Sequence, residues 1–383
     1  MKLGIYVHVP YCVRKCRYCD FESAPLKGRE DTVAPYFEQL CRRIRRAGEA
    51  LGGSFTVDSV FFGGGTPSVV APLQLAGVMD ALRTSFSVEE DCESSLEVNP
   101  GTLSEEKLSA YRAAGFNRIS MGVQSFDDRV LKKMGRIHDS QEAIRSFALA
   151  RRYFDNINLD LMMGVPGQDL FSWKATLQQA LALSPEHLSF YSLQLEEGTP
   201  FYEDYRSGRL QLPSWEEDRR MYHETLAQLA SCGYVHYEVS NAAKPGRQCR
   251  HNLKYWTMQP YLGFGSAAHS FLAGRRFEAG IPPILSSQEA LRAAEESCCF
   301  SHFPDLQKKE LQGDYLFTGL RLIEGLDKNR FEQLFGCSYA SVYGEETRRL
   351  IEEGLLRDTG SAVAFTAAGL DQTNPVMERL LNL

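Results

Sequence analysis

Short apolar segments with the composition of β-strands alternate with helical patterns over the first 205 residues, and this alternation constrains the fold most. The strand-like segments lie at 3–9, 58–64, 95–100, 118–125, 156–164 and 187–195. Helical patterns lie between them, at 33–51, 72–84, 104–114, 139–153 and 169–183. Strands that alternate with helices in this way pair in parallel through right-handed crossovers. The sequence therefore predicts an α/β fold whose ligands bind at the carboxyl ends of the strands.

The pattern changes after residue 205. A helix is predicted near 214–232, and the Pro-rich stretch at 280–287 has the composition of a linker. Helical patterns and then a strand pair near 355–366 follow, as in a small winged-helix unit. We therefore expect three parts, which are a barrel-like sheet at 1–205, a segment that caps it at 206–290, and a small, mainly helical domain at 291–383.

Composition and charge exclude several classes of protein. The 383 residues are 43% hydrophobic and carry a net charge of −7, which disfavours a broad nucleic-acid-binding surface. No run of 18 apolar residues occurs, so we expect no integral membrane protein. The N-terminal segment has neither the length nor the cleavage site of a signal peptide, and we expect a cytoplasmic protein.

Three of the ten cysteines lie close together directly after the first predicted strand. Cys12, Cys16 and Cys19 form a CxxxCxxC pattern, and Phe21 stands where a fourth cysteine would be expected. In a reducing compartment, clustered cysteines more often bind metal or do redox chemistry than form disulfides. Three thiolates can hold a [4Fe–4S] cluster and leave one iron open to a ligand. A structural zinc knuckle and incidental surface cysteines are the alternatives.

This spacing resembles that of the radical S-adenosylmethionine (SAM) superfamily, in which SAM chelates the open iron and is cleaved to a radical. The glycines in "FFGGGTPS" (61–68) offer unobstructed N–H groups at a strand end, although they also suit a tight turn. The resemblance assigns Gly64, Gly65 and Thr66 to the methionyl part of SAM. It also favours Glu97 as a partner of the ribose hydroxyls, the alternative being a salt bridge inside the barrel.

A closer resemblance covers residues 3–375 and includes "EVNPG", "GVQSF" and "DLMMGVPGQ" in their family order. These motifs are similar to those of the oxygen-independent coproporphyrinogen III oxidases and their relatives. The resemblance implies a partial (β/α)6 radical SAM barrel with a smaller, mainly helical, winged-helix-like C-terminal domain. It places Tyr6 and Tyr18 beside SAM and the three cysteines on the cluster. A second SAM pocket would be lined by Gln124, Arg136, Asp160 and Ser192.

Two departures favour the HemW-type haem chaperone branch of these relatives. Phe21 replaces the further cysteine of the oxidases, and their N-terminal extension does not precede the first strand. In addition, "RHNLKYW" (250–256) fits the HNxxYW signature of that branch. The resemblance implies a haem site at His251, Asn252, Tyr255 and Trp256. His251 would be an axial ligand and the aromatic rings would pack on the macrocycle. A loop that caps the barrel mouth, with His251 and Asn252 simply hydrogen-bonded, is the alternative.

The expected function is therefore that of a haem chaperone which binds one haem per chain and passes it to an acceptor protein. A membrane-bound respiratory enzyme is one candidate acceptor, and the expected cofactors are a [4Fe–4S] cluster, SAM and haem. A coproporphyrinogen III oxidase of porphyrin biosynthesis is the main alternative, and another radical SAM reaction on a tetrapyrrole is the third. Oxidase activity is not expected, no residue is assigned a catalytic role, and whether SAM is cleaved stays open.

Overall fold

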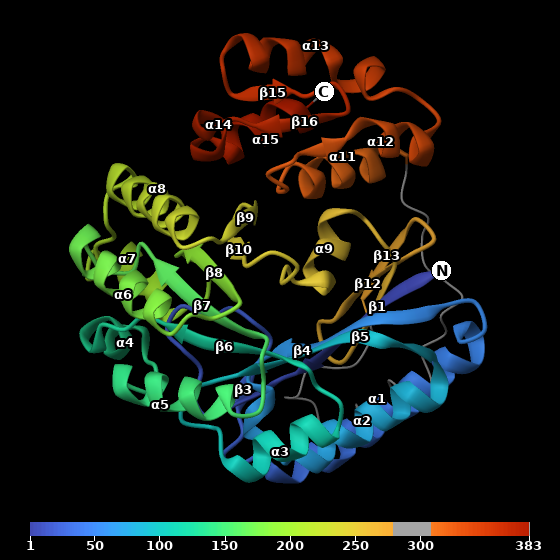
Figure 1. Cartoon of the computed structure of the whole chain (residues 1–383), viewed down its shortest axis with the longest axis vertical. Coiled ribbons are helices and arrows are strands. Elements are labelled where there is room, and N and C mark those ends of the chain that lie inside the picture. The colour runs from blue at the N-terminus through green and yellow to red at the C-terminus, as the bar shows by residue number, and fades with distance from the viewer. Residues whose placement is uncertain (279–307, 383) are drawn as a thin grey trace.

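A computed structural model describes residues 1–278 and 308–382. Its main feature is one eleven-stranded sheet in the order β13-β12-β11-β1-β4-β5-β6-β7-β8-β10-β9 (Figure 1). The six central strands pair in parallel, which confirms the predicted partial (β/α)6 barrel. They are β1 (Lys2–Val9), β4 (Thr56–Gly64), β5 (Ser87–Val98), β6 (Arg118–Gln124), β7 (Ile157–Met163) and β8 (His187–Ser192).

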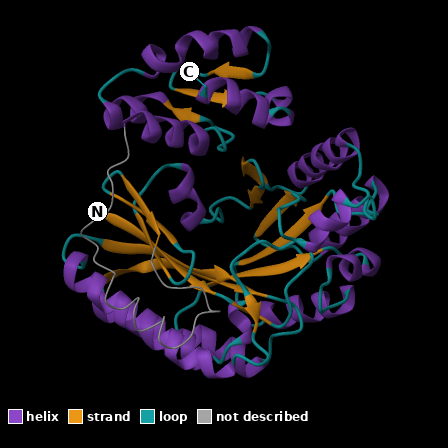
Figure 2. Ribbon diagram, turned by 180° about the vertical axis from the view of Figure 1, so that it is seen from behind, coloured by secondary structure: helices purple, strands orange, loops and turns teal. Residues whose placement is uncertain are grey.

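Helices cover the outer face of this sheet. Figures 1 and 2 show the long helices along one side of the strands and the C-terminal unit on the other. The helices of this part are α1 (Glu30–Leu51), α2 (Pro72–Ser85), α3 (Glu105–Ala113), α4 (Asp128–Met134), α5 (Ser140–Arg151), α6 (Leu170–Ala182), α7 (Pro200–Arg206) and α8 (Trp215–Ser231). Alternate residues of β1, such as Ile5 and Val7, are fully buried in the same core as Leu40 and Ile44 of α1. This burial of apolar surface fixes which face of the sheet the helices cover.

Residues 206–278 extend the sheet at both edges. On one side β10 (Asn241–Ala243) pairs antiparallel with β8, and β9 (Val235–Glu238) pairs with β10. On the other side β11 (Tyr261–Phe264) pairs in parallel with β1, followed by β12 (His269–Leu272) and β13 (Arg275–Glu278). Between these edges the chain forms the short helix α9 (Arg250–Trp256), which holds the HNxxYW motif.

Residues 308–382 form a separate, mainly helical unit with its own apolar core, as predicted. Its core includes Tyr315, Phe331 and Leu350. The predicted strand pair is present as β15 (Leu356–Asp358) and β16 (Ala362–Phe365), and β14 (Leu326–Asp327) completes a small sheet. The helices are α11 (Lys308–Gly319), α12 (Lys328–Phe335), α13 (Tyr339–Glu352), α14 (Ala367–Asp371) and α15 (Thr373–Leu381). The linker predicted at 280–287 and the boundary at 290/291 lie outside the described residues.

The segment that carries the three cysteines follows β1 directly. It is held by a short parallel pair, β2 (Tyr11–Cys12) with β3 (Ala24–Pro25), and lies against the 3-10 turn η1 (Pro67–Val69) that follows β4. The cysteines therefore lie at the edge where the parallel strands end. In the described part of the chain, no helix combines the length and the apolar character that a membrane crossing requires.

Candidate functional site

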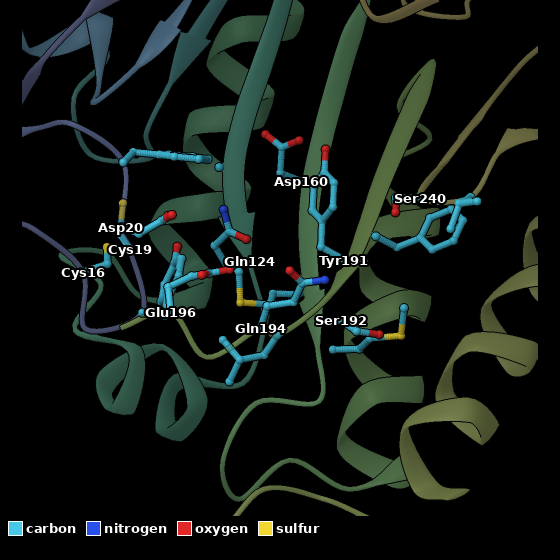
Figure 3. Close-up of a pocket in the computed structure, with 18 of the residues that line it drawn as sticks. Cys16, Cys19, Asp20, Gln124, Asp160, Tyr191, Ser192, Gln194, Glu196 and Ser240 are labelled. Atoms are coloured by element: carbon cyan, nitrogen blue, oxygen red, sulfur yellow. The ribbon is translucent and has the colours of Figure 1, made fainter. Parts of the chain in front are cut away.

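A cavity of about 1010 Å³ opens at the carboxyl ends of the parallel strands. Figure 3 shows Gln124, Asp160 and Tyr191 on neighbouring strands, with Cys16 and Cys19 on the loop to one side. Twelve of the residues predicted from the sequence line this cavity. They are Cys12, Cys16, Tyr18, Cys19, Gly64, Gly65, Thr66, Glu97, Gln124, Arg136, Asp160 and Ser192.

The cysteine loop is tied to the strand ends through its sulfur atoms. The Thr66 hydroxyl lies 3.6 Å from the Cys12 sulfur, and Nη1 of Arg136 lies 3.4 Å from the Cys16 sulfur. Burial raises the pKa of the Cys12 thiol and raises that of Cys19 to about 11. Both thiols are therefore protonated at neutral pH in this structure, and binding to a metal would displace their protons.

The donor set fits an iron–sulfur cluster better than a single metal ion. Among residues 1–278 and 308–382, no three His, Cys, Asp or Glu side chains lie close enough to hold one ion. A cubane cluster binds each cysteine through a different iron and does not require such convergence. A structural zinc site normally takes four protein ligands. Here Phe21 stands where a fourth cysteine would be expected, and its side chain is exposed beside the cavity. Three cysteines without a fourth match a cluster with one open iron.

The glycine-rich turn does not offer free N–H groups, so that expectation was wrong. The N–H of Gly64 donates to Oε2 of Glu97 at 3.1 Å, and that of Gly65 donates to the carbonyl of Val9 at 2.9 Å. The N–H of Thr66 donates to the carbonyl of Tyr11 at 2.7 Å. The local sequence could not reveal these partners, because Val9 and Tyr11 lie more than 50 residues earlier and Glu97 lies 33 residues after Gly64.

Glycine is required in this turn by close packing against the end of β1. Gly64 has φ = +107°, and a Cβ there would lie 2.4 Å from the His8 ring. A Cβ on Gly65 would lie 2.7 Å from the Tyr11 carbonyl oxygen. The turn therefore brings β4 against the cysteine loop, which positions any ligand held between them.

Two partly buried carboxyl groups, those of Glu97 and Asp160, lie in the wall of the cavity and influence each other through their charge. Burial, together with the charge of Asp160, raises the pKa of Glu97 to about 8. Burial also raises the pKa of Asp160, which accepts hydrogen bonds from the Ser120 hydroxyl at 3.1 Å and from Nδ2 of Asn158 at 2.8 Å. A carboxyl that is protonated near neutral pH can both donate to and accept from hydroxyl groups. This pair is suited to bind a sugar diol.

Two of the cavity residues predicted from the sequence have a polar side-chain atom without a hydrogen-bond partner among the described residues. Gln124 has φ = 67° at the end of β6, and its buried Oε1 has no hydrogen-bond partner among the described residues. Arg136 donates from Nη2 to Oδ1 of Asn99 at 2.6 Å, but its buried Nε has no such partner. Buried polar atoms are usually paired with protein, water or a ligand. These two side chains are therefore available to a polar ligand.

Ser192 is already engaged in this structure. Its hydroxyl donates to Oδ2 of Asp218 at 3.1 Å and accepts from Nη2 of Arg219 at 3.1 Å. Asp218 and Arg219 lie on α8 and also line the cavity, and Arg219 lies 3.7 Å from Asp371 in the C-terminal unit. The sequence does not reveal this cluster, because charged residues in an amphipathic helix carry no signal that distinguishes a cavity wall from a solvated face.

Tyr6 and part of the HNxxYW motif line a second, smaller cavity of about 180 Å³. It lies inside the barrel and shares Glu97, Ser120, Asp160 and Tyr191 with the large one. We call it the inner cavity. Its remaining lining residues are Tyr6, Phe61, Arg118, Asn158, Ser189, His251, Asn252 and Tyr255.

His251 is fully buried, and both of its ring nitrogens have partners. Nδ1 lies 3.0 Å from the Ser59 hydroxyl, and Nε2 lies 2.8 Å from the Tyr255 hydroxyl. Burial, with the charges of Lys254 and Arg118, lowers the pKa of His251 to about 3, so the ring is neutral. In this conformation neither nitrogen is free to bind iron. Axial ligation by His251 stays a prediction, and it would require one of these contacts to break.

Trp256 lines neither of these two cavities. The guanidinium of Arg321, from the C-terminal unit, lies 4.5 Å from the centre of its ring. Arg321 also lies 3.5 Å from the buried carboxylate of Glu238. In this structure Trp256 therefore packs between the barrel and the C-terminal unit, and its predicted contact with haem stays a prediction.

Comparisons with known proteins agree with this arrangement. Residues 6–180 match the model of the radical SAM superfamily, and residues 306–371 match that of the HemN C-terminal domain. The protein named "Heme chaperone HemW" in Bacillus subtilis is 34% identical, over 95% of each chain. The chain belongs to the HemW family. The HemW of Escherichia coli is 40% identical over 70% of this chain and 69% of its own.

Two further relatives extend the comparison. A bovine mitochondrial member named radical S-adenosyl methionine domain-containing protein 1 is 35% identical, over 93% of this chain and 82% of its own. Among solved structures, the coproporphyrinogen III oxidase HemN from Escherichia coli, titled a radical SAM enzyme, superposes with a TM-score of 0.83. It covers 99% of this chain and 89% of its own, but it is 23% identical in sequence. This likeness shows the fold alone.

Proposed function

We propose that this chain is a cytoplasmic haem carrier that binds one haem and passes it to an acceptor protein. The observation that carries this proposal is the similarity, along nearly the whole chain, to HemW proteins that bear the name heme chaperone. Phe21 supports the same conclusion, because it replaces the further cysteine of the oxidase pattern. A membrane-bound respiratory enzyme remains our candidate acceptor.

The large cavity is the proposed site of a [4Fe–4S] cluster and of SAM. Cys12, Cys16 and Cys19 would hold the cluster, which would offer an open iron to SAM and a source of one electron. The chain itself would contribute polar groups in the wall of the large cavity that orient SAM. The residues that would orient SAM are Tyr18, Gly64, Gly65, Thr66 and Glu97, with Gln124, Arg136, Asp160 and Ser192 on the far side of the cavity.

The haem macrocycle would lie in the same large cavity. Its volume of about 1010 Å³ is at the upper end of the range for ligand pockets, whereas the inner cavity, at about 180 Å³, is below that range. Phe21 and Trp215 both line the large cavity, and their side chains are 62% and 60% exposed. Exposed aromatic rings beside a cavity whose walls also include apolar side chains, such as Met162, Met163 and Phe190, suit a planar apolar ligand.

An anaerobic titration tests the proposal. The cluster is rebuilt, haem is added, and the absorption spectrum is followed with and without SAM. We expect saturation near one haem per chain. If no saturable site is found, the proposal fails, and coproporphyrinogen turnover with detection of 5′-deoxyadenosine would then test the oxidase alternative.

A further inference from the structure

The inner cavity contains an arginine that is buried almost without hydrogen bonds. Arg118, on β6, is 1% exposed and lines this cavity. It makes one hydrogen bond within the described residues, from Nη1 to the Ser95 hydroxyl at 3.4 Å, and its Nε has no partner. A guanidinium offers five N–H donors, and burying them unpaired is costly. A group that accepts hydrogen bonds is therefore missing from its surroundings.

The nearby acidic groups do not supply this acceptor. Glu93 and Asp160 act on Arg118 through their charge, but within the described residues neither accepts a hydrogen bond from it, and Oε1 of Glu93 and both oxygens of Asp160 accept from other groups. Glu93 accepts from the N–H of His251 at 3.2 Å and from the Cys249 thiol at 3.6 Å. Asp160 accepts from Ser120 and Asn158. The charge of Arg118 is thus partly balanced, while most of its donors stay available.

Neutral donors from the HNxxYW helix line the same cavity. Within the described residues, the side chain of Asn252 makes no hydrogen bond, and the Tyr255 hydroxyl is hydrogen-bonded to His251 alone. Glu97 completes the wall toward the large cavity and, with a pKa of about 8, is mostly uncharged at neutral pH. It therefore repels an incoming anion much less than an ionised carboxylate would.

We propose that the inner cavity binds a carboxylate through Arg118, with Asn252 and Tyr255 beside it, and that this carboxylate is a propionate of haem. The inference rests on the proposed function. A guanidinium binds a carboxylate in the plane of its N–H groups, which suits the donors that Arg118 leaves free. The cavities share Glu97, Ser120, Asp160 and Tyr191, so a short side chain can pass from a macrocycle in the large cavity. The HNxxYW helix then recognises the edge of haem and does not bind its iron.

The test compares haem with its dimethyl ester, in which both propionates are esterified. Each is titrated into the cluster-loaded protein and followed by absorption. We expect the ester to bind about 10- to 100-fold more weakly than haem, as the loss of a charge-assisted hydrogen bond implies. In Arg118→Gln, haem affinity is expected to fall to the level of the ester, whose own affinity changes little.

Two further variants separate recognition from folding. Asn252→Leu keeps Arg118 and is expected to weaken the binding of haem more than the binding of the ester. Arg250→Gln, which changes a residue of α9 paired with the exposed Asp91, is the matched control and is expected to leave both affinities unchanged. Sodium propionate is added as the free carboxylate, and we expect it to compete with haem in the wild type but not in Arg118→Gln.

Each remaining outcome is decisive. Equal binding of haem and ester by the wild type overturns the inference while the proposed function stands. A second outcome is that haem and its ester bind equally while propionate raises the melting temperature of the wild type but not that of Arg118→Gln. In that case the inner cavity binds a free carboxylate, and the assignment to a haem propionate is overturned. If neither haem nor ester saturates, the proposed function itself fails.

Discussion

The carboxyl of Glu97, on β5, accepts a hydrogen bond from the N–H of Gly64, on β4, with 3.1 Å between the atoms. This contact joins the two strand ends that frame the cysteine loop. It also fixes a carboxyl group at the boundary between the large and inner cavities. The pKa of that carboxyl and the shape of the glycine turn lead to the first two predictions.

Replacing Glu97 with Gln should flatten the pH dependence of stability. The native pKa of Glu97 is about 8, whereas a carboxyl in the unfolded chain titrates near 4.5. As pH rises through this window the unfolded chain releases a proton that the native protein keeps, so the contribution of Glu97 to wild-type stability falls between about pH 5 and 8. Melting temperatures measured across this range without SAM would check it. If the melting temperature of Glu97→Gln depends on pH in the same way as that of the wild type, the raised pKa assigned to Glu97 is contradicted.

Gly64→Ala should destabilise the protein by about 1–3 kcal/mol, because a side chain is strained at this positive φ and its Cβ would meet the His8 ring. Gly77→Ala is the matched control, since it lies within α2 and a Cβ there meets nothing within 4 Å. That change should stabilise by about 0.5–1 kcal/mol. Urea unfolding of the three proteins would compare them, and similar midpoints for all would refute the packing argument.

Arg321→Ala should destabilise the protein by about 2–4 kcal/mol. It removes the cation that faces the fully buried Glu238 and the guanidinium that stacks on Trp256. Arg348→Ala removes an exposed pair with Glu352 in the same unit and should cost under about 0.5 kcal/mol. Calorimetry of both variants would show whether the barrel and the C-terminal unit separate in Arg321→Ala. If Arg321→Ala and Arg348→Ala have the same melting curve, the contact of Arg321 with Glu238 and Trp256 does not stabilise the protein as proposed.

Tyr255→Phe should cost about 1–2 kcal/mol, since it leaves Nε2 of the buried His251 without its partner. Tyr202→Phe, which removes an exposed hydrogen bond to Glu197, is the control and should be nearly neutral. The haem absorption spectrum should be the same in Tyr255→Phe as in the wild type. A shift to a histidine-ligated spectrum would mean that His251 reaches the iron once it is released.

The sequence predicted the six parallel strands, because each combines apolar residues with flanking turns. The strand predicted at 95–100 is shorter than the observed β5 (Ser87–Val98), because the first residues of the observed strand, "SVEED", are mostly polar. Those polar residues are in the sheet because Ser87 and Val88 pair with Thr56 and Val57 of β4. A pairing partner that lies about 30 residues away leaves no local pattern to detect.

The sequence motifs predicted which polar residues line the large cavity, but they did not predict the hydrogen bonds that these residues make. The motifs indicated Gln124 and Asp160, which come from strands that end at the same edge. They gave no sign that the His251 ring faces Ser59, since that pairing depends on how α9 packs against β4. Arg118 was overlooked for a related reason. A single arginine in an apolar strand looks like a salt-bridge residue until its missing partners are seen.

Native mass spectrometry of the anaerobically rebuilt protein, incubated with SAM and excess haem, tests the central claim most directly. The account predicts single chains that carry one [4Fe–4S] cluster and one haem together, because both occupy parts of the same large cavity without excluding each other. Chains that carry either the cluster or haem, but never both, would contradict it.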